Sequence, residues 1–108
     1  MSDSNLSALS ALGTAQEVSA NNIANVSTDG FKVSSVVLES GPEGQGVQVA
    51  AIQQSTNAGP MIDGVEGSNT DIGTEMVDMM RTGHAFSANV AAVRATEEMT
   101  GHLLNMIA

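Results

Sequence analysis

The fold of this protein is decided by residues 71–107, which read DIGTEMVDMMRTGHAFSANVAAVRATEEMTGHLLNMI. The stretch contains no proline, and one set of positions alternates in steps of four and three throughout: Ile72, Met76, Met79, Gly83, Phe86, Val90, Val93, Glu97, Thr100, Leu104 and Ile107. All but Gly83, Glu97 and Thr100 are large apolar residues. This heptad spacing predicts a long helix that carries a coiled-coil seam.

A second helix is predicted over residues 6–26, which contain no proline and a single glycine. Apolar and small residues recur there in steps of three and four, and residues 27–30 (Ser-Thr-Asp-Gly) form a strong turn signal. At ~1.5 Å per residue the two helices would measure about 30 and 55 Å. An antiparallel pair would leave roughly 25 Å of the longer helix uncovered. Because the apolar seam continues along that length, we expect it to contact another chain.

The middle of the chain differs from both ends. It holds both prolines, six glycines between positions 41 and 67, and two β-branched patches at residues 32–38 and 46–52. These patches predict a hairpin around a loop at residues 39–44, while residues 53–67 predict a polar connector that is extended or flexible. We therefore expect a mainly α fold in one structural unit: an N-terminal helix and turn (1–30), a hairpin and connector (31–67) and a C-terminal helix (68–108).

Composition excludes several function classes. Twelve acids face three bases, Lys32, Arg81 and Arg94, so the formal charge is -9 and binding to nucleic acid or to an anionic membrane surface is disfavoured. No apolar run approaches the ~20 residues of a membrane span. The polar, acidic start at residues 1–5 is unlike a signal peptide, and the chain has no cysteine. Only 2% of the residues are aromatic, so we expect much apolar burial to occur against a partner.

No group of residues resembles an active site, and we predict no catalytic, cofactor-binding, metal or small-molecule site. A metal site on Asp71, Glu75 and Asp78 is conceivable, but the positive end of the helix dipole and solvation account for these carboxylates. Ser68 and Asp71 could form a capping box, or Asp71 could itself be the N-cap. His84 and His102 lie about 27 Å apart along one helix, which makes them surface or interface residues rather than ligands of one metal.

Three asparagines crowd the end of the first predicted helix: Asn21, Asn22 and Asn25. Asparagine is a poor helix former, but its amide can both donate and accept hydrogen bonds. Two interpretations stay open at this point. The cluster could be an elaborate helix cap and turn, or it could be a polar junction at which chains meet in an assembly.

Residues 20–32, ANNIANVSTDGFK, resemble the N-terminal signature of bacterial flagellar rod and hook proteins. Residues 66–71, EGSNTD, and residues 75–80, EMVDMM, are similar to two C-terminal motifs of the same family. Both similarities occur in the family's order. The middle segment is too short for the extra domains of hook and distal rod proteins, so the resemblance is to the short proximal rod type.

This resemblance implies a structural subunit of the flagellar basal-body rod, assembled with itself and with other axial proteins after type III export without a cleaved signal peptide. Apolar seam residues and two asparagines are then expected to form the assembly interface: Leu9, Leu12, Asn22, Ile23, Asn25, Met76, Met79, Phe86, Val90, Val93 and Leu104. The alternative hypothesis is a non-axial coiled-coil adaptor or export accessory protein with similar termini. Such a protein would form a discrete oligomer rather than co-assemble with rod proteins.

Overall fold

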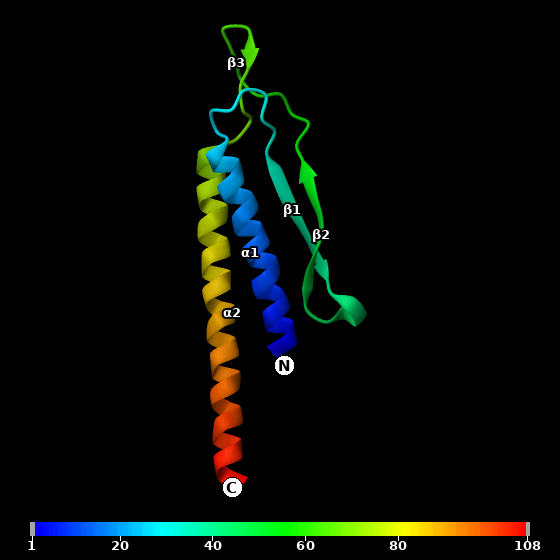
Figure 1. The fold of residues 1–108 in the computed structure, drawn as a ribbon, viewed down its shortest axis with the longest axis vertical. Coiled ribbons are helices and arrows are strands. Elements are labelled where there is room, and N and C mark those ends of the chain that lie inside the picture. The colour runs from blue at the N-terminus through cyan, green and yellow to red at the C-terminus, as the bar shows by residue number, and fades with distance from the viewer. Residues whose placement is uncertain (1, 108) are drawn as a thin grey trace.

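A computed structural model describes residues 2–107 of the chain. Two helices, α1 (Ser2–Ala24) and α2 (Ile72–Ile107), lie side by side and run in opposite directions (Figure 1). Between them in sequence come β1 (Ser34–Ser40), a short 3-10 turn η1 (Pro42–Gly44) and β2 (Val47–Gln54), followed by β3 (Met61–Ile62) and β4 (Val65–Glu66). The predicted mainly helical fold with paired terminal helices and a small hairpin is confirmed.

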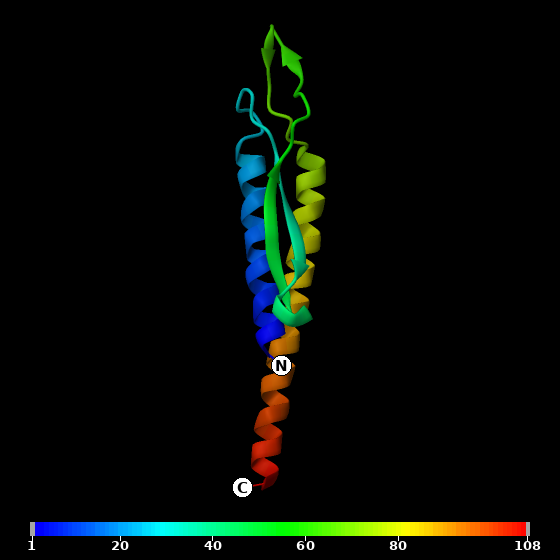
Figure 2. The same ribbon diagram turned by 90° about the vertical axis from the view of Figure 1, so that its right-hand side faces the viewer.

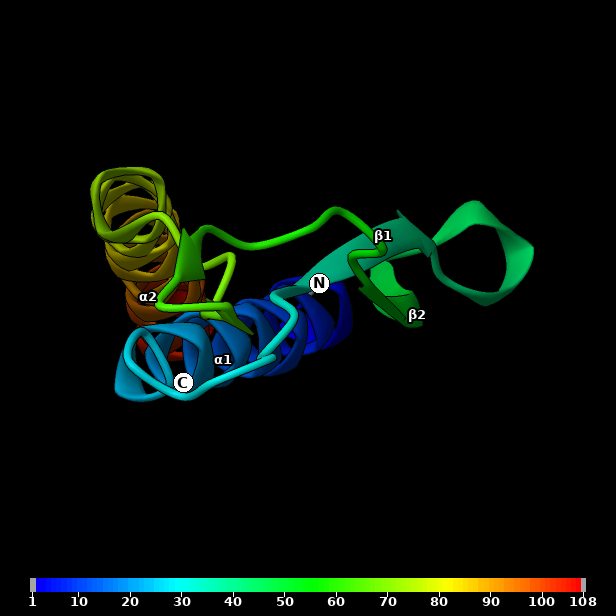
Figure 3. The ribbon, with the colours of Figure 1, turned by 90° about the horizontal axis from the view of Figure 1, so that it is seen from above.

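The molecule is long and thin, with principal extents of 73 × 26 × 14 Å. Helix α1 lies between α2 and the β1–β2 hairpin (Figures 1 and 3), and the hairpin runs along the helices rather than away from them (Figure 2). Because α1 has 23 residues and α2 has 36, α2 continues well past the first turn of α1. The described residues beyond position 96 are all exposed.

The β1–β2 hairpin has the predicted topology with shifted ends. Ser34 pairs with Gln54 and Ser40 with Val47, and the register changes between Val37 and Leu38. Its loop is held against α1 by Ser7, whose Oγ accepts the amide hydrogen of Val47 over 3.1 Å. A two-stranded sheet is marginal alone, and packing along α1 supplies the support it needs.

The expectation that residues 53–67 form only a polar connector, extended or flexible, is wrong. Met61–Ile62 and Val65–Glu66 pair as a second hairpin, which projects beyond the end of the helix pair (Figure 1). Asp63 and Gly64 form its turn with φ values of 51° and 79°. Both φ values are positive, as in a type I′ turn, and Asp-Gly between apolar residues is its usual sequence.

The start of α2 settles the choice left open between two helix caps. The amide of Thr74 donates to Asp71 Oδ1 over 3.2 Å, so Asp71 is the N-cap. Ser68 forms no capping box with Asp71. The Ser68 Oγ instead accepts the amide hydrogen of Thr70 and donates to the Thr70 hydroxyl.

The hydrophobic core is very small. Among the residues described, Ala11 is the one apolar side chain that is fully buried, with 3% exposed. The contact between α1 and α2 is made by half-buried side chains, which include Met79, Val90 and Val93 of the predicted seam. A chain with so little apolar burial gains little free energy by folding alone.

Candidate functional site

Asn22 is the most deeply buried large side chain in the molecule, with 1% exposed. It lies near the end of α1, where its Oδ1 accepts the Ser34 amide hydrogen over 3.0 Å and its Nδ2 donates to the Ser34 carbonyl over 2.9 Å. The same Nδ2 donates to Glu75 Oε1 over 3.0 Å. The Asn22 carbonyl accepts a hydrogen bond from the Thr70 hydroxyl. One side chain therefore ties α1 to β1 and to the first turn of α2.

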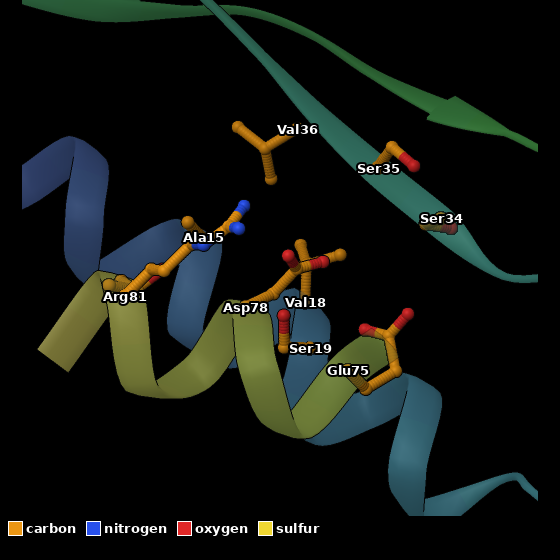
Figure 4. Close-up of a pocket in the computed structure, with 10 residues that line it drawn as sticks. Ala15, Val18, Ser19, Ser34, Ser35, Val36, Glu75, Asp78 and Arg81 are labelled. Carbon is orange, nitrogen blue, oxygen red and sulfur yellow. The ribbon is translucent and has the colours of Figure 1, made fainter. Parts of the chain in front are cut away.

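Glu75 is the second buried member of this junction, with 8% exposed. The expectation that solvation accounts for this carboxylate is wrong, since its place between the helices removes it from water. It borders a polar pocket of about 300 Å³ between α1, β1 and α2. Figure 4 shows Glu75 and Asp78 rising from α2 toward β1, while the Arg81 side chain extends toward Ala15 of α1. No salt bridge joins Arg81 to either carboxylate among residues 2–107.

A second polar network joins the segment after α1 to the segment before α2. Asn69 accepts the Val33 amide hydrogen over 2.7 Å, and its Nδ2 donates to Ser55 Oγ and to the Asn57 carbonyl. The backbone N–H of Asn69 in turn donates to the Phe31 carbonyl. These bonds hold together three segments, at residues 31–33, 55–57 and 69. They lie at the end of the helix pair where α1 ends and α2 begins.

The Lys32–Glu66 ion pair completes this second network, and it is the one salt bridge found within the described part of the chain. Lys32 Nζ also donates to the Asn57 carbonyl, and the Gly59 amide donates to Glu66. The hydrogen bond from Lys32, then that from Gly59, then the Lys32 charge hold the pKa of Glu66 below its usual value.

The remaining notable feature is exposed apolar surface on α2. Ten large apolar residues of this helix are more than a third exposed: Ile72, Met76, Val77, Met80, Phe86, Met99, Leu103, Leu104, Met106 and Ile107. Exposed apolar surface of this extent on a small protein marks an interaction surface. No group of acidic, histidine or cysteine residues that could hold a metal ion occurs in residues 2–107. No helix of this region is long and apolar enough to cross a membrane.

Two family models match the chain, one at each end. Residues 3–32 match "Flagella basal body rod protein", and residues 64–106 match "Flagellar basal body rod FlgEFG protein C-terminal". The chain belongs to the flagellar basal-body rod protein family. It is a structural rod protein and not an enzyme. The comparison with curated proteins found no match for this chain.

The two networks lie where the matched segments of this rod protein meet. Asn22, Phe31 and Lys32 come from the first segment, and Glu66, Asn69 and Glu75 come from the second. Residues that the sequence analysis treated as two separate signatures are therefore hydrogen-bonded partners. Asn69 stands in the EGSNTD stretch, but its bonding role was not predicted, and Ser34 was not predicted as part of the site at all. No single-sequence signal links either residue to its distant partner.

The predicted interface residues occupy different environments. Asn22 is buried between segments of its own chain. The Asn25 side chain caps the end of α1, because its Nδ2 donates to the Asn21 carbonyl and its Oδ1 accepts from the Thr28 hydroxyl. The interpretation as a helix cap and turn thus holds for Asn25, and Asn22 joins segments of one chain. A junction between chains at this cluster stays a prediction. The remaining apolar residues are half-buried or exposed: Leu9, Leu12, Ile23, Met79, Val90 and Val93 are half-buried, and Met76, Phe86 and Leu104 are exposed. Their part in contacts between chains stays a prediction.

The two histidines contribute nothing to either network. His84 and His102 both lie on the exposed surface of α2.

Proposed function

We propose that this rod protein packs into the wall of the flagellar rod through the exposed apolar side chains of α2, against other axial subunits and further copies of itself. One observation carries the proposal. Among the residues that the structure describes, no large apolar side chain is fully buried, whereas four of the five fully buried side chains are polar. Burying apolar surface contributes ~25 cal/mol per Å², so contacts along α2 would supply the stability that the subunit lacks.

The interface of this proposal consists of Met76, Phe86 and Leu104, with the half-buried Met79, Val90 and Val93 at its edge. Asn22 acts within the subunit and supports this surface indirectly, because it holds α2 against α1. Asn25 fixes the turn at the end of α1 in the same indirect way.

We also propose export through the flagellar type III apparatus in a little-folded state. Because Ala11 is the one fully buried apolar side chain among residues 2–107, the chain has little stability to overcome before it is threaded through a narrow channel. Assembly would then complete its folding, as in other segments that order on binding.

Locating the protein in purified basal bodies tests this function. A tagged chain should co-purify with the rod and should be lost when the rod is absent. A chain found only as a soluble oligomer of fixed size outside basal bodies would instead favour the coiled-coil adaptor.

A further inference from the structure

One groove on the surface is lined by the two helices alone. Its volume is about 270 Å³. Six residues line it: Leu12, Gly13, Gln16, Thr82, Gly83 and Phe86. A methyl group built on Gly13 or on Gly83 would meet no heavy atom within 4 Å, so the groove is open above both glycines. Phe86 forms one side of it and is 40% exposed.

The groove also contains an incompletely satisfied amide. Gln16 Nε2 donates to the Met79 carbonyl over 3.4 Å, while Gln16 Oε1 is buried and has no hydrogen-bond partner among residues 2–107. An occupant that brings both apolar side chains and a hydrogen-bond donor would therefore suit this groove once the Gln16 side chain turns toward it.

The chain itself contains a segment of this kind, residues 97–107 of α2, which we call the overhang. Every residue of the overhang is exposed, and its apolar side chains are 58–81% accessible: Met99, Leu103, Leu104, Met106 and Ile107. The overhang also carries donors in Asn105 and His102. It is the part of α2 that continues past the start of α1 (Figure 1), and the heptad positions of α2 run on through it as Thr100, Leu104 and Ile107. The overhang therefore extends a helix surface that α1 covers elsewhere in the same chain.

We propose that the overhang of one copy occupies the α1–α2 groove of a second copy. This rests on the proposed function and names the partner of its apolar surface. Charge favours this pairing over other self-contacts, because two chains of charge -9 repel each other at most of their surface. The groove has no charged lining residue. Glu97 and Glu98 stand at the start of the overhang, and the rest of it, residues 99–107, contains no Asp, Glu, Lys or Arg. The parts that would meet, the groove and residues 99–107, are thus uncharged regions of a strongly acidic chain.

The contact joins the overhang of one copy to the groove of another. Each pair of copies therefore keeps one free overhang and one free groove. Such a head-to-tail interface builds an open assembly rather than a closed dimer. With the copies pointing the same way, the overhang centred on Leu103 would lie beside Gly83 of the next copy. Successive copies would then be displaced by about 30 Å along α2.

Disulfide trapping tests the proposal, since the natural chain has no cysteine. The full chain with Gly83→Cys and Leu103→Cys is oxidised at high micromolar concentration and separated by size. These two positions lie about 30 Å apart on one helix, so a bond between them within one chain is excluded. We expect a ladder of covalent multimers. The control pair, Ala91→Cys with Leu103→Cys, places one cysteine at an exposed position outside the groove, whereas Gly83 is half-buried. The control should nevertheless give several-fold less of the multimer ladder.

A third variant adds Gly13→Leu to the trapping pair and fills the groove from α1. A Cβ atom at Gly13 would meet no heavy atom within 4 Å, and leucine favours the helix more than glycine does, so the variant should fold and its ladder should fall several-fold. A ladder equal to that of the control pair, or one that Gly13→Leu leaves unchanged, would overturn the proposal. A chain that enters basal bodies but forms no ladder refutes the contact between copies and leaves the rod function standing. A ladder from a chain absent from basal bodies refutes the rod function alone.

Discussion

The side-chain amide of Asn22 donates a 3.0 Å hydrogen bond to Glu75 Oε1, and water reaches almost none of either residue. The two residues are 53 positions apart, one in each of the segments that match the rod family. A buried carboxylate is costly unless it is hydrogen-bonded, so Glu75 depends on Asn22 for its place between the helices. The bond fixes the start of α2 against the end of α1.

Asn22→Ala should lower the free energy of unfolding by about 3 kcal/mol, because it leaves the Ser34 backbone and the Glu75 carboxylate without their partner. Urea unfolding followed by circular dichroism, with an osmolyte present to populate the folded state, measures this loss. The control is Asn21→Ala on the exposed side of the same turn, which should stay within ~0.5 kcal/mol. Equal losses in both variants would refute the special role of Asn22.

Replacing Glu75 separates its charge from its hydrogen bond. Glu75→Gln keeps an oxygen that accepts from Asn22 but buries no charge, so at neutral pH it should unfold at the same or a higher urea concentration than the natural chain. Glu75→Ala should be clearly less stable, since it leaves Asn22 Nδ2 short of a partner. If Gln damaged the protein as much as Ala, the carboxylate itself would be required.

The Lys32–Glu66 pair predicts a loss of local order in acid. The pKa of Glu66 is held below its usual value, so the stability it contributes is complete above about pH 4.3, the value of a free glutamate, and declines as the pH falls through the lower folded pKa. The protection factor for amide hydrogen exchange at Gly59, whose N–H donates to Glu66, should therefore fall in that range. Glu66→Gln should abolish this pH dependence. The matched change Asp63→Asn in the nearby turn should preserve it, and an unchanged profile in Glu66→Gln would contradict the assignment.

Two glycines of the β1–β2 loop make a matched test of how the hairpin is attached. Gly44 and Gly46 have φ values of 73° and 74°, so alanine at either should cost about 1–2 kcal/mol in backbone strain. Only at Gly46 would the added methyl group collide with Ser7, whose Oγ holds the Val47 amide. Exchange of the Val47 amide hydrogen should accelerate in Gly46→Ala much more than in Gly44→Ala. Equal protection in the two variants would show that Ser7 does not anchor the loop.

Phe86 should matter more to the assembly than to the subunit. Because it is 40% exposed, Phe86→Ala should cost the isolated chain well under the ~3 kcal/mol of a fully buried phenylalanine. Phe86→Asp would bury an unpaired charge in any contact with another chain, so the variant should be produced and exported yet fail to enter the rod, leaving cells non-motile. Swimming assays and blots of basal bodies measure this. Ala91→Asp adds the same charge to an exposed position outside the seam and should be tolerated; normal motility of Phe86→Asp would remove Phe86 from the interface.

The purified chain at low micromolar concentration should be much less helical than the 23 residues of α1 and 36 of α2 would give. Packing of an apolar face provides most helix stability in proteins, and little of that packing exists within one copy. Far-ultraviolet circular dichroism over a range of concentrations provides the measurement. A cooperative thermal transition with full helix content in the dilute chain would show that the subunit is stable alone.

The sequence by itself determined the two helices, the main hairpin and the family, because each depends on a local pattern. The heptad steps from Ile72 to Ile107 mark a helix whatever it packs against, and the family signatures are contiguous. The Asp63-Gly64 turn was equally local and could have been predicted, since Asp-Gly between apolar residues is a strong hairpin signal.

Only the tertiary structure decided which polar residues are buried and paired. Glu75 near the start of a helix reads as a solvated carboxylate until α1 and β1 are placed over it, and Asn22 reads as a helix cap until Ser34 and Glu75 are placed beside it. Burial and long-range hydrogen bonds depend on how the elements are arranged in space, which no periodicity of one segment encodes. The apolar seam shows the same division. Its spacing revealed that it must be covered, whereas the fold decided that α1 lies along only part of it and that every residue from Glu97 to Ile107 stays exposed.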